Sequence, residues 1–252
     1  MSLSKGVVMH DSSVFRKAAE YSAGTMCIEF NKKNLCEMVD ISAVRTISGK
    51  AEVDEVAKMA KEHQFICAFA MPNLTAYLRD QLIGSGVRLG GTMGFPSGAE
   101  MPEMKIACAK ELVKIGCDEL DMVIAVNWLK SGMYDEVLDE IKQLAEIADG
   151  RVFKSIIEVK YLTEDEIKRA CELAVRGGVT FVKSGTGWSG TTTVDHIRLM
   201  KSVVGNDAKI KAAGGVRDLA TIRAMVDAGC ERFGISCASM KNIMEEVKAA
   251  AL

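Results

Sequence analysis

Aromatic side chains and an excess of either charge are both scarce in this chain of 252 residues. Aromatic residues make up 6% of it, and 32 basic residues nearly balance 34 acidic ones, for a formal net charge of −2. So few aromatics argue against a platform on which single-stranded nucleic acid stacks. The balanced charge excludes a general electrostatic attraction to nucleic acid or to an anionic membrane, although it permits a local basic pocket.

Membrane spans, metal-binding motifs and stiff linkers are missing as well. No apolar run approaches the roughly 18 residues of a transmembrane helix. No Cys-x-x-Cys motif occurs and the three histidines show no ligand spacing, so we expect no structural zinc site. The eight cysteines lie in apolar runs without a signal peptide, which indicates free buried thiols and a cytoplasmic location. With three prolines and no shift in composition, residues 1–252 are expected to form one domain.

The sequence does contain a regular alternation of strand-length apolar runs and helical patterns. Strands are predicted at residues 35–41, 65–71, 87–95, 119–126, 152–159, 179–183, 209–213 and 232–235. Helices are predicted at 52–63, 100–115, 134–148, 163–176, 194–204, 219–228 and 241–252, with an extra N-terminal helix at 12–22. Eight strands in about 250 residues favour an α/β fold, a single (β/α)8 TIM barrel. An open, doubly wound sheet is the alternative.

Charged residues near the ends of the predicted strands are candidates for chemistry, because barrel enzymes build their sites there. Asp121 lies within the apolar run at 119–126. Desolvating a lone carboxylate is costly, so Asp121 must be either paired or functional, and this strand alone does not decide between the two. Glu158 also ends a predicted strand, and Lys160 two residues later points the same way, which predicts an internal ion pair.

Two lysines, Lys183 and Lys211, lie near the ends of neighbouring predicted strands. A lone lysine at such a position usually extends its ammonium group to solvent. Two close lysines lower each other's pKa, as does burial, and the resulting neutral amine can attack a carbonyl carbon. Together with Asp121, the two lysines predict a Schiff-base enzyme.

Small residues at the ends of the last two predicted strands are candidates for phosphate binding. Gly214, Gly215, Gly234 and Ser236 lie where barrels bind phosphate through backbone N–H groups. Ordinary turns are the alternative. Residues 185–190 match the dinucleotide pattern Gly-x-Gly-x-x-Gly, but no acid ends the following strand, so we regard this match as weak.

Several of these segments resemble the deoxyribose-phosphate aldolase family. The resemblance is carried by residues 94–96, 118–124, 129–132, 181–187, 210–217 and 232–236, and it extends from about Val39 to Met240. It implies a class I aldolase, without a metal or other cofactor, that reversibly cleaves 2-deoxy-D-ribose 5-phosphate to D-glyceraldehyde 3-phosphate and acetaldehyde. It also implies a small phosphosugar as partner, neither nucleic acid nor membrane, and a homodimer.

The resemblance assigns roles to residues that match the family's motifs. Lys183 would form the Schiff base, Lys211 would lower the pKa of Lys183, and Asp121 would relay protons through water. The substrate phosphate would be held by Gly187, Gly214, Gly215, Gly234 and Ser236.

Other positions depart from the family pattern. Gly185 and Cys237 replace residues with hydroxyl groups. The family's early Asp-His-Thr motif reads Asp40-Ile41-Ser42 in this chain. Ala125 stands where the family commonly has a polar residue or proline, and a lysine at position 160, after Glu158, is unusual for the family. The lost hydroxyls predict a weaker phosphate site. The alternatives are a related aldolase or lyase for another phosphorylated aldehyde or ketose, a phosphosugar isomerase or transaldolase, and a non-catalytic sugar-phosphate-binding barrel.

Overall fold

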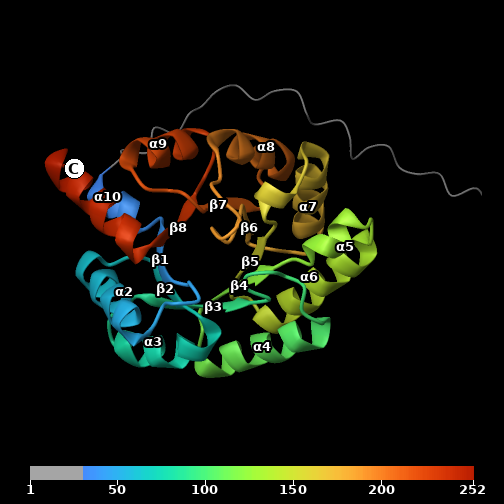
Figure 1. Cartoon of the computed structure of the whole chain (residues 1–252), viewed down its shortest axis with the longest axis horizontal. Helices are drawn as coiled ribbons and strands as arrows, with labels where there is room; N and C mark the ends of the chain where they lie inside the picture. The colour runs from blue at the N-terminus through green and yellow to red at the C-terminus, as the bar shows by residue number, and fades with distance from the viewer. Residues whose placement is uncertain (1–30) are drawn as a thin grey trace, which may run out of the picture.

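The computed structural model describes residues 31–252, and eight parallel strands in this part of the chain close into a barrel (Figure 1). The strands are β1 (Val39–Ala43), β2 (Cys67–Ala70), β3 (Arg88–Met93), β4 (Glu119–Val123), β5 (Val152–Ile156), β6 (Phe181–Lys183), β7 (Lys209–Ala213) and β8 (Arg232–Ser236). Each strand pairs with the next in sequence, and β8 pairs with β1. The predicted (β/α)8 barrel is confirmed, and an open sheet is excluded. The predicted helix at 12–22 lies outside the described residues, so a single domain over residues 1–252 stays a prediction.

Helices surround the barrel in chain order, and the last of them returns beside α2 (Figure 1). The longer helices are α2 (Lys50–His63), α3 (Thr75–Leu82), α4 (Pro102–Ile115), α6 (Tyr134–Ala148), α7 (Glu164–Arg176), α8 (Val194–Val204), α9 (Leu219–Asp227) and α10 (Cys237–Ala249). The shorter ones are α1 (Lys32–Cys36), α5 (Val126–Lys130) and the 3-10 turns η2 (Pro72–Leu74) and η3 (Val159–Tyr161). The sequence prediction missed α3, because a helix this short, with few buried positions, shows little periodicity.

Some predicted strands are longer than the observed ones because burial continues beyond the hydrogen-bonded ladder. Ile124 and Ala125 follow β4 and are still buried, and Val126 already begins α5. The first half of the predicted strand at 35–41 is wrong, since Leu35 belongs to α1, which Asn31 caps. Hydropathy reports burial, so it does not by itself mark where strand pairing begins or ends.

Side-chain caps fix the starts of α7 and α10, as they do those of α1, α8 and α9. The predicted capping box of α7 is confirmed: Thr163 Oγ1 accepts from the N–H of Glu166, and Glu166 Oε2 accepts from the N–H of Thr163. Helix α10 begins four residues before its predicted start, because Ser236 Oγ caps it by accepting from the N–H of Ser239. This early start brings the N-terminus of α10 directly to the end of β8.

The outer surface of the barrel packs against apolar helix faces, as in other folds of this class. Within residues 31–252 no helix is both long enough and apolar enough to cross a membrane. The seven cysteines in this range are free thiols, and six of them are buried. The inside of the barrel differs from this apolar shell, because charged side chains fill its centre.

Candidate active site

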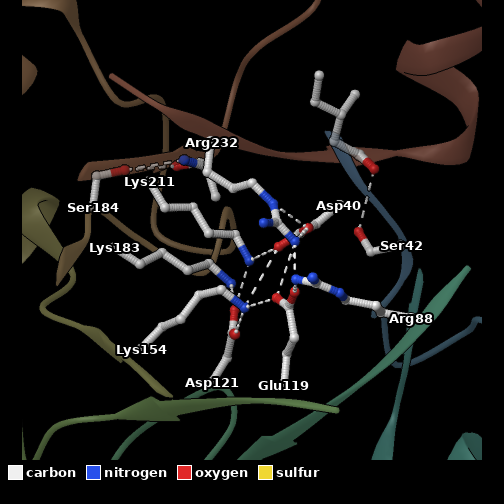
Figure 2. A network of polar contacts seen from close by, with 12 residues as sticks. Asp40, Ser42, Arg88, Glu119, Asp121, Lys154, Lys183, Ser184, Lys211 and Arg232 are labelled. Atoms are coloured by element: carbon white, nitrogen blue, oxygen red, sulfur yellow. Dashed lines mark hydrogen bonds and ion pairs between the residues drawn. The ribbon is translucent and has the colours of Figure 1, made fainter. Parts of the chain in front are cut away.

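The three predicted catalytic side chains meet inside the barrel. Asp121 comes from β4, Lys183 from the end of β6 and Lys211 from β7, and all three are buried. Lys183 Nζ lies 2.9 Å from Asp121 Oδ2, and Lys211 Nζ lies 2.7 Å from the same oxygen (Figure 2). The structure therefore brings together the residues that the sequence singled out.

Strand register explains why these side chains converge. Lys183 is the direct partner of Lys211 in the β6–β7 ladder, and Asp121 is the partner of Lys154 in the β4–β5 ladder. Paired residues of adjacent strands point to the same face of a sheet, and residues two apart on one strand do so as well. Glu119 therefore faces the barrel interior together with Asp121 (Figure 2).

Sequence reasoning missed most of the ion-pair network that surrounds the three residues. Lys154 Nζ lies 2.7 Å from Asp121 Oδ1 and 2.6 Å from Glu119 Oε2. Arg232 pairs with Glu119 at 2.9 Å and with Asp40 at 2.6 Å, and Asp40 Oδ2 in turn contacts the ammonium group of Lys211. The signal that could have found them is a charged residue at an inward position of a predicted strand, as for Asp121.

The buried charges of this network do not balance. The buried cationic groups outnumber the buried carboxylates by one. The cationic side chains are Lys154, Lys183, Lys211 and Arg232, and the carboxylates are Asp40, Glu119 and Asp121. Half-exposed Arg88, 3.1 Å from Glu119, adds to the positive side. A net charge in a low-dielectric interior is unfavourable, and the loss of one proton from one lysine relieves it.

Among the three lysines of this network, Lys183 is the one that its surroundings favour for the loss of a proton. Burial, followed by the positive charges of Lys211 and Lys154, lowers the pKa of Lys183 to about 8, although Asp121 opposes the shift. Burial also disfavours the charged form of Lys154, but Asp121, Asp40 and Glu119 outweigh it and raise the pKa of Lys154 above its usual value. A neutral amine is therefore within reach near neutral pH at Lys183.

Asp121 is held in its ionised form. Burial alone would raise the pKa of Asp121, but Lys154, Lys183 and Lys211 outweigh it and hold that pKa well below the usual range. Its Oδ2 contacts the ammonium nitrogens of both Lys183 and Lys211. A carboxylate in this position can steer protons between the two amines or a water molecule beside them.

An aromatic ring closes one side of the charged cluster. The ring centroid of Phe69 lies 4.7 Å from Lys211 Nζ and 5.1 Å from Lys154 Nζ, within the range of cation–π attraction. Gly90 on β3 makes room for it, because a Cβ at this position would overlap the Phe69 ring. The ring thus covers the ammonium groups of Lys211 and Lys154, and both side chains are buried.

Two adjoining cavities open beside these lysines. The inner one, of about 30 Å³, is lined by Lys183, Lys211 and Phe69 among others. The outer one, of about 140 Å³, is lined by all five residues predicted to hold phosphate, which are Gly187, Gly214, Gly215, Gly234 and Ser236. Thr186, Ser42, Val44 and Gly234 line both cavities, so the two lie side by side.

The outer cavity also contains side chains that the sequence analysis did not assign to it. Arg45 and Arg217, both exposed, line it together with the hydroxyl-bearing residues Ser42, Thr186 and Ser239. The two guanidinium groups match the geometry of phosphate oxygens. The carboxylate of Glu52 also lines the cavity, so the two guanidinium groups leave its charged side chains with a net positive charge that suits an anion.

One group of side chains in the barrel has the spacing of metal ligands. Asp40, Cys67 and Glu119 offer ligand atoms that lie within 4.8 Å of one another. The two carboxylates are already paired with Lys211, Lys154 and Arg232, and burial raises the pKa of the Cys67 thiol well above its usual value. This donor set carries no uncompensated negative charge for a cation, so it fits a metal poorly.

The sequence model of the DeoC/LacD family of aldolases matches residues 47–241. The chain belongs to this family. It is 38% identical to a deoxyribose-phosphate aldolase of Coprothermobacter proteolyticus, over 88% of this chain and 98% of the relative. It is 41% identical to one of Sinorhizobium medicae, over 81% of this chain and 83% of the relative.

Solved structures agree with this family assignment. The aldolase QR15 superposes with a TM-score of 0.80 at 31% identity, covering 85% of this chain and 96% of QR15. A tetrameric deoxyribose phosphate aldolase from Aeropyrum pernix has the same fold, with a TM-score of 0.80 at 23% identity, covering 87% of this chain and 93% of the other.

One departure from the aldolase family pattern, Cys237, lies outside the lining of the outer cavity. Cys237 was expected to deprive the phosphate site of a hydroxyl, but its buried Sγ lies 3.5 Å from Met59 Sδ, and Cys237 does not line the outer cavity. Ser239, one helical turn beyond the cap, lines the cavity instead, with its Oγ 3.2 Å from that of Ser236. The early start of α10 turns residue 237 away and residue 239 inward.

A second expectation concerned Glu158, and it is wrong. Glu158 was expected to pair with Lys160, but its carboxylate instead accepts hydrogen bonds from Thr186 and Ser189. The left-handed backbone at Glu158, with φ 56°, turns the side chain toward the β6–α8 loop. Gly185 permits this arrangement, because a Cβ there would lie 2.7 Å from Glu158 Oε1.

Proposed function

We propose that this chain is a class I deoxyribose-phosphate aldolase that uses Lys183 as its Schiff-base residue. The observation that carries the proposal is the position of Lys183: a buried amine, with its pKa lowered to about 8, that lines a cavity adjoining a pocket suited to an anion. The names of the curated relatives support the choice of 2-deoxyribose 5-phosphate as substrate.

The reaction begins at the neutral amine of Lys183. Its lone pair attacks the C1 carbonyl of the open-chain sugar phosphate, and loss of water from the carbinolamine leaves a protonated imine. Removal of the proton from the C3 hydroxyl then breaks the C2–C3 bond. The electron pair of that bond moves to the iminium nitrogen, which gives an enamine and releases glyceraldehyde 3-phosphate. Protonation of the enamine at C2 and hydrolysis of the imine return acetaldehyde and the free lysine.

Lys211 and Asp121 support these proton transfers in different ways. The positive charge of Lys211 lowers the pKa of Lys183, so more of the nucleophile is neutral at pH 7. The carboxylate of Asp121 contacts both amines, and we assign it the proton relay to and from the sugar through a water molecule. Neither step needs a metal ion or a second cofactor.

The phosphate of the substrate would lie in the outer cavity. Residues of the β6–α8 and β7–α9 loops and of the N-terminus of α10 line this cavity, and anions are stabilised at helix N-termini. Arg45, Arg217 and Ser239 supplement these backbone groups. Weaker phosphate binding than in other family members was expected because Gly185 and Cys237 lack hydroxyl groups. The hydroxyl of Ser239 lines the cavity and would take the place of the one missing at Cys237.

Two points about the wider context stay predictions. We expect a homodimer, which size-exclusion chromatography with light scattering would show. We also expect a cytoplasmic enzyme, in keeping with buried free thiols.

Borohydride trapping tests the proposal directly. The protein is incubated with deoxyribose 5-phosphate, reduced, digested and mapped by mass spectrometry, and the adduct is expected on the peptide that contains Lys183. An isomerase would give no reduced adduct, and a binding protein would give no turnover. A label on Lys211 or Lys160 would overturn the assignment of the Schiff base to Lys183.

Substrate preference tests the phosphate pocket separately. We expect kcat/KM for deoxyribose 5-phosphate to exceed that for unphosphorylated deoxyribose by at least about tenfold, the effect of one hydrogen bond to a charged group. A ratio near one would mean that the glycine loops are plain turns.

A further inference from the structure

Glu158 is a buried carboxylate that the proposed chemistry does not use. It follows β5, is 3% exposed, and adopts a left-handed backbone conformation that non-glycine residues seldom take. Burying a charge and straining the backbone at the same residue is unfavourable, so the surrounding contacts must offset both costs. The contacts of Glu158 show which part of the molecule depends on it.

All three donors to Glu158 lie on one short segment, the beginning of the β6–α8 loop. The N–H of Thr186 donates to Oε2 at 3.1 Å, and the hydroxyl of Thr186 donates to the same oxygen. The hydroxyl of Ser189 donates to Oε1. Thr186 Oγ1 also accepts from the N–H of Trp188 at 3.0 Å, so both the N–H of Thr186 and that of Trp188 are tied down. The carboxylate thus fixes the loop at both ends of residues 186–189.

The residue between these anchor points is Gly187, which lines the outer cavity. Its φ of 84° is left-handed, and a Cβ on it would lie 3.3 Å from the Cα of Gly214, so the two glycine loops pack closely together. Thr186 and Trp188 line the same cavity. On the far side the Trp188 indole donates to the carbonyl of Val44, after β1, at 3.0 Å. A loop held in this way fixes the backbone of Gly187 in the wall of the outer cavity.

We propose that Glu158 is a positioning residue that holds the β6–α8 loop in its anion-binding conformation and thereby sets the preference for a phosphorylated substrate. The inference rests on the proposed function, because it assigns the outer cavity to the substrate phosphate. Glu158 does not line that cavity, and its two carboxylate oxygens accept from three donors of the loop, so the carboxylate is directed at the loop and not at the bound anion.

The test replaces Glu158 by glutamine, which preserves the shape of the side chain. One carboxylate oxygen becomes an NH2 group, which cannot accept the hydrogen bonds that Thr186 and Ser189 donate. In Glu158→Gln we expect KM for deoxyribose 5-phosphate to rise by about tenfold or more, the effect of a lost charge-assisted hydrogen bond. The kcat, and the KM for unphosphorylated deoxyribose, are expected to stay within about threefold. Isothermal titration calorimetry with inorganic phosphate should show a weaker Kd by a similar factor.

Glu140→Gln is the matched control, since it also neutralises a buried glutamate but on α6, away from both cavities. It should lower Tm and leave the phosphate preference unchanged. Ser189→Ala removes one donor from a half-buried residue and so tests the contact even where Glu158→Gln does not fold. We expect it to raise KM for the phosphorylated substrate by about two- to tenfold, as for a single hydrogen bond.

The outcomes separate this inference from the proposed function. If wild-type protein binds inorganic phosphate and both variants bind it equally well, the role of Glu158 is overturned while the aldolase proposal stands. Equal losses of kcat with both sugars would also overturn it, because a loop that acts only on the phosphate cannot produce them. If the wild type binds phosphate but forms no imine, the aldolase proposal fails, and weaker phosphate binding by the variants still supports the positioning role.

Discussion

Two buried lysines of this molecule, Lys183 in the barrel and Lys105 between helices, are placed in different surroundings. Burial lowers the pKa of both. Lys105 Nζ lies 2.7 Å from Glu140 Oε1 and donates to the carbonyl of Val123, so one cation meets one carboxylate, and Lys105 lines neither cavity of the candidate active site. Lys183 shares its single carboxylate with two further lysines and faces a cavity.

The difference shows that a lowered pKa is not enough to mark a nucleophile. At Lys105 the ion pair connects α4 with α6 and with the end of β4, which is a structural role. At Lys183 the local excess of positive charge makes deprotonation favourable, and the cavity admits a carbonyl compound. Charge imbalance together with access distinguishes the reactive lysine from the structural one.

The largest expected effects come from replacing each of the two lysines by methionine, and the free energy of unfolding should change in opposite directions in the two variants. Lys183→Met should abolish turnover and borohydride labelling, yet stabilise the protein at pH 7 by on the order of 1 to 3 kcal/mol, because it removes a disfavoured buried charge. Lys105→Met should retain labelling and destabilise the protein by about 3 kcal/mol or more, because it leaves Glu140 unpaired. Chemical denaturation of both variants checks this.

The pH dependence of that stability follows from the pKa of Lys183. Its folded-state pKa of about 8 lies below the usual value of 10.5, so the folded protein binds fewer protons between these two values. The penalty in the wild type is complete below about pH 8 and disappears as the pH approaches 10.5. The stability advantage of Lys183→Met should shrink over that range, and an advantage independent of pH would contradict this account.

The next effect concerns the shared carboxylate. Asp121→Asn should reduce kcat by more than about a hundredfold, the usual contribution of a general acid or base. It should also move the pH midpoint of labelling below that of the wild type, because Asp121 opposes the lowering of the Lys183 pKa. Near-normal activity at neutral pH would mean that Asp121 is only structural.

A smaller and pH-dependent effect is expected at the second lysine. Lys211→Leu removes a positive charge that lowers the pKa of Lys183, so that pKa should rise. A rise of about one unit would reduce activity at pH 7 about tenfold, and raising the pH should restore most of it. Loss of activity without a shift of the pH profile would argue for a role other than charge.

The smallest effects concern the hydroxyl groups of the phosphate pocket. Ser239→Ala should raise KM for deoxyribose 5-phosphate by about two- to tenfold with kcat unchanged, as expected for one hydrogen bond. Cys237→Ser is its control, because Cys237 packs against Met59 and does not line the cavity. Steady-state kinetics of the two variants show which of the two positions faces the phosphate, and a larger effect at position 237 would contradict our placement of Ser239.

The sequence predicted the barrel and three residues of the central cluster because hydropathy and strand ends carry that information. It did not reveal Lys154 or Arg232, although Lys154 is the ladder partner of Asp121 and Arg232 that of Lys211, because hydropathy does not show the register that places them on one face. Closure of the barrel brings β8 against β1 and so places Arg232 beside Asp40, a contact between residues far apart in sequence. The partners of Glu158 were missed because its left-handed backbone breaks the alternation that the strand pattern assumes.

The most direct test of the central claim is the pH dependence of Lys183 reactivity in the wild-type protein. The rate of imine trapping, with the modified peptide mapped at each pH, is followed from about pH 6 to about pH 11, a range that covers ordinary and lowered lysine pKa values. The charge imbalance predicts a midpoint at about 8 for Lys183. A midpoint at the ordinary value of 10.5 would show that the barrel does not activate this lysine, and would contradict the account.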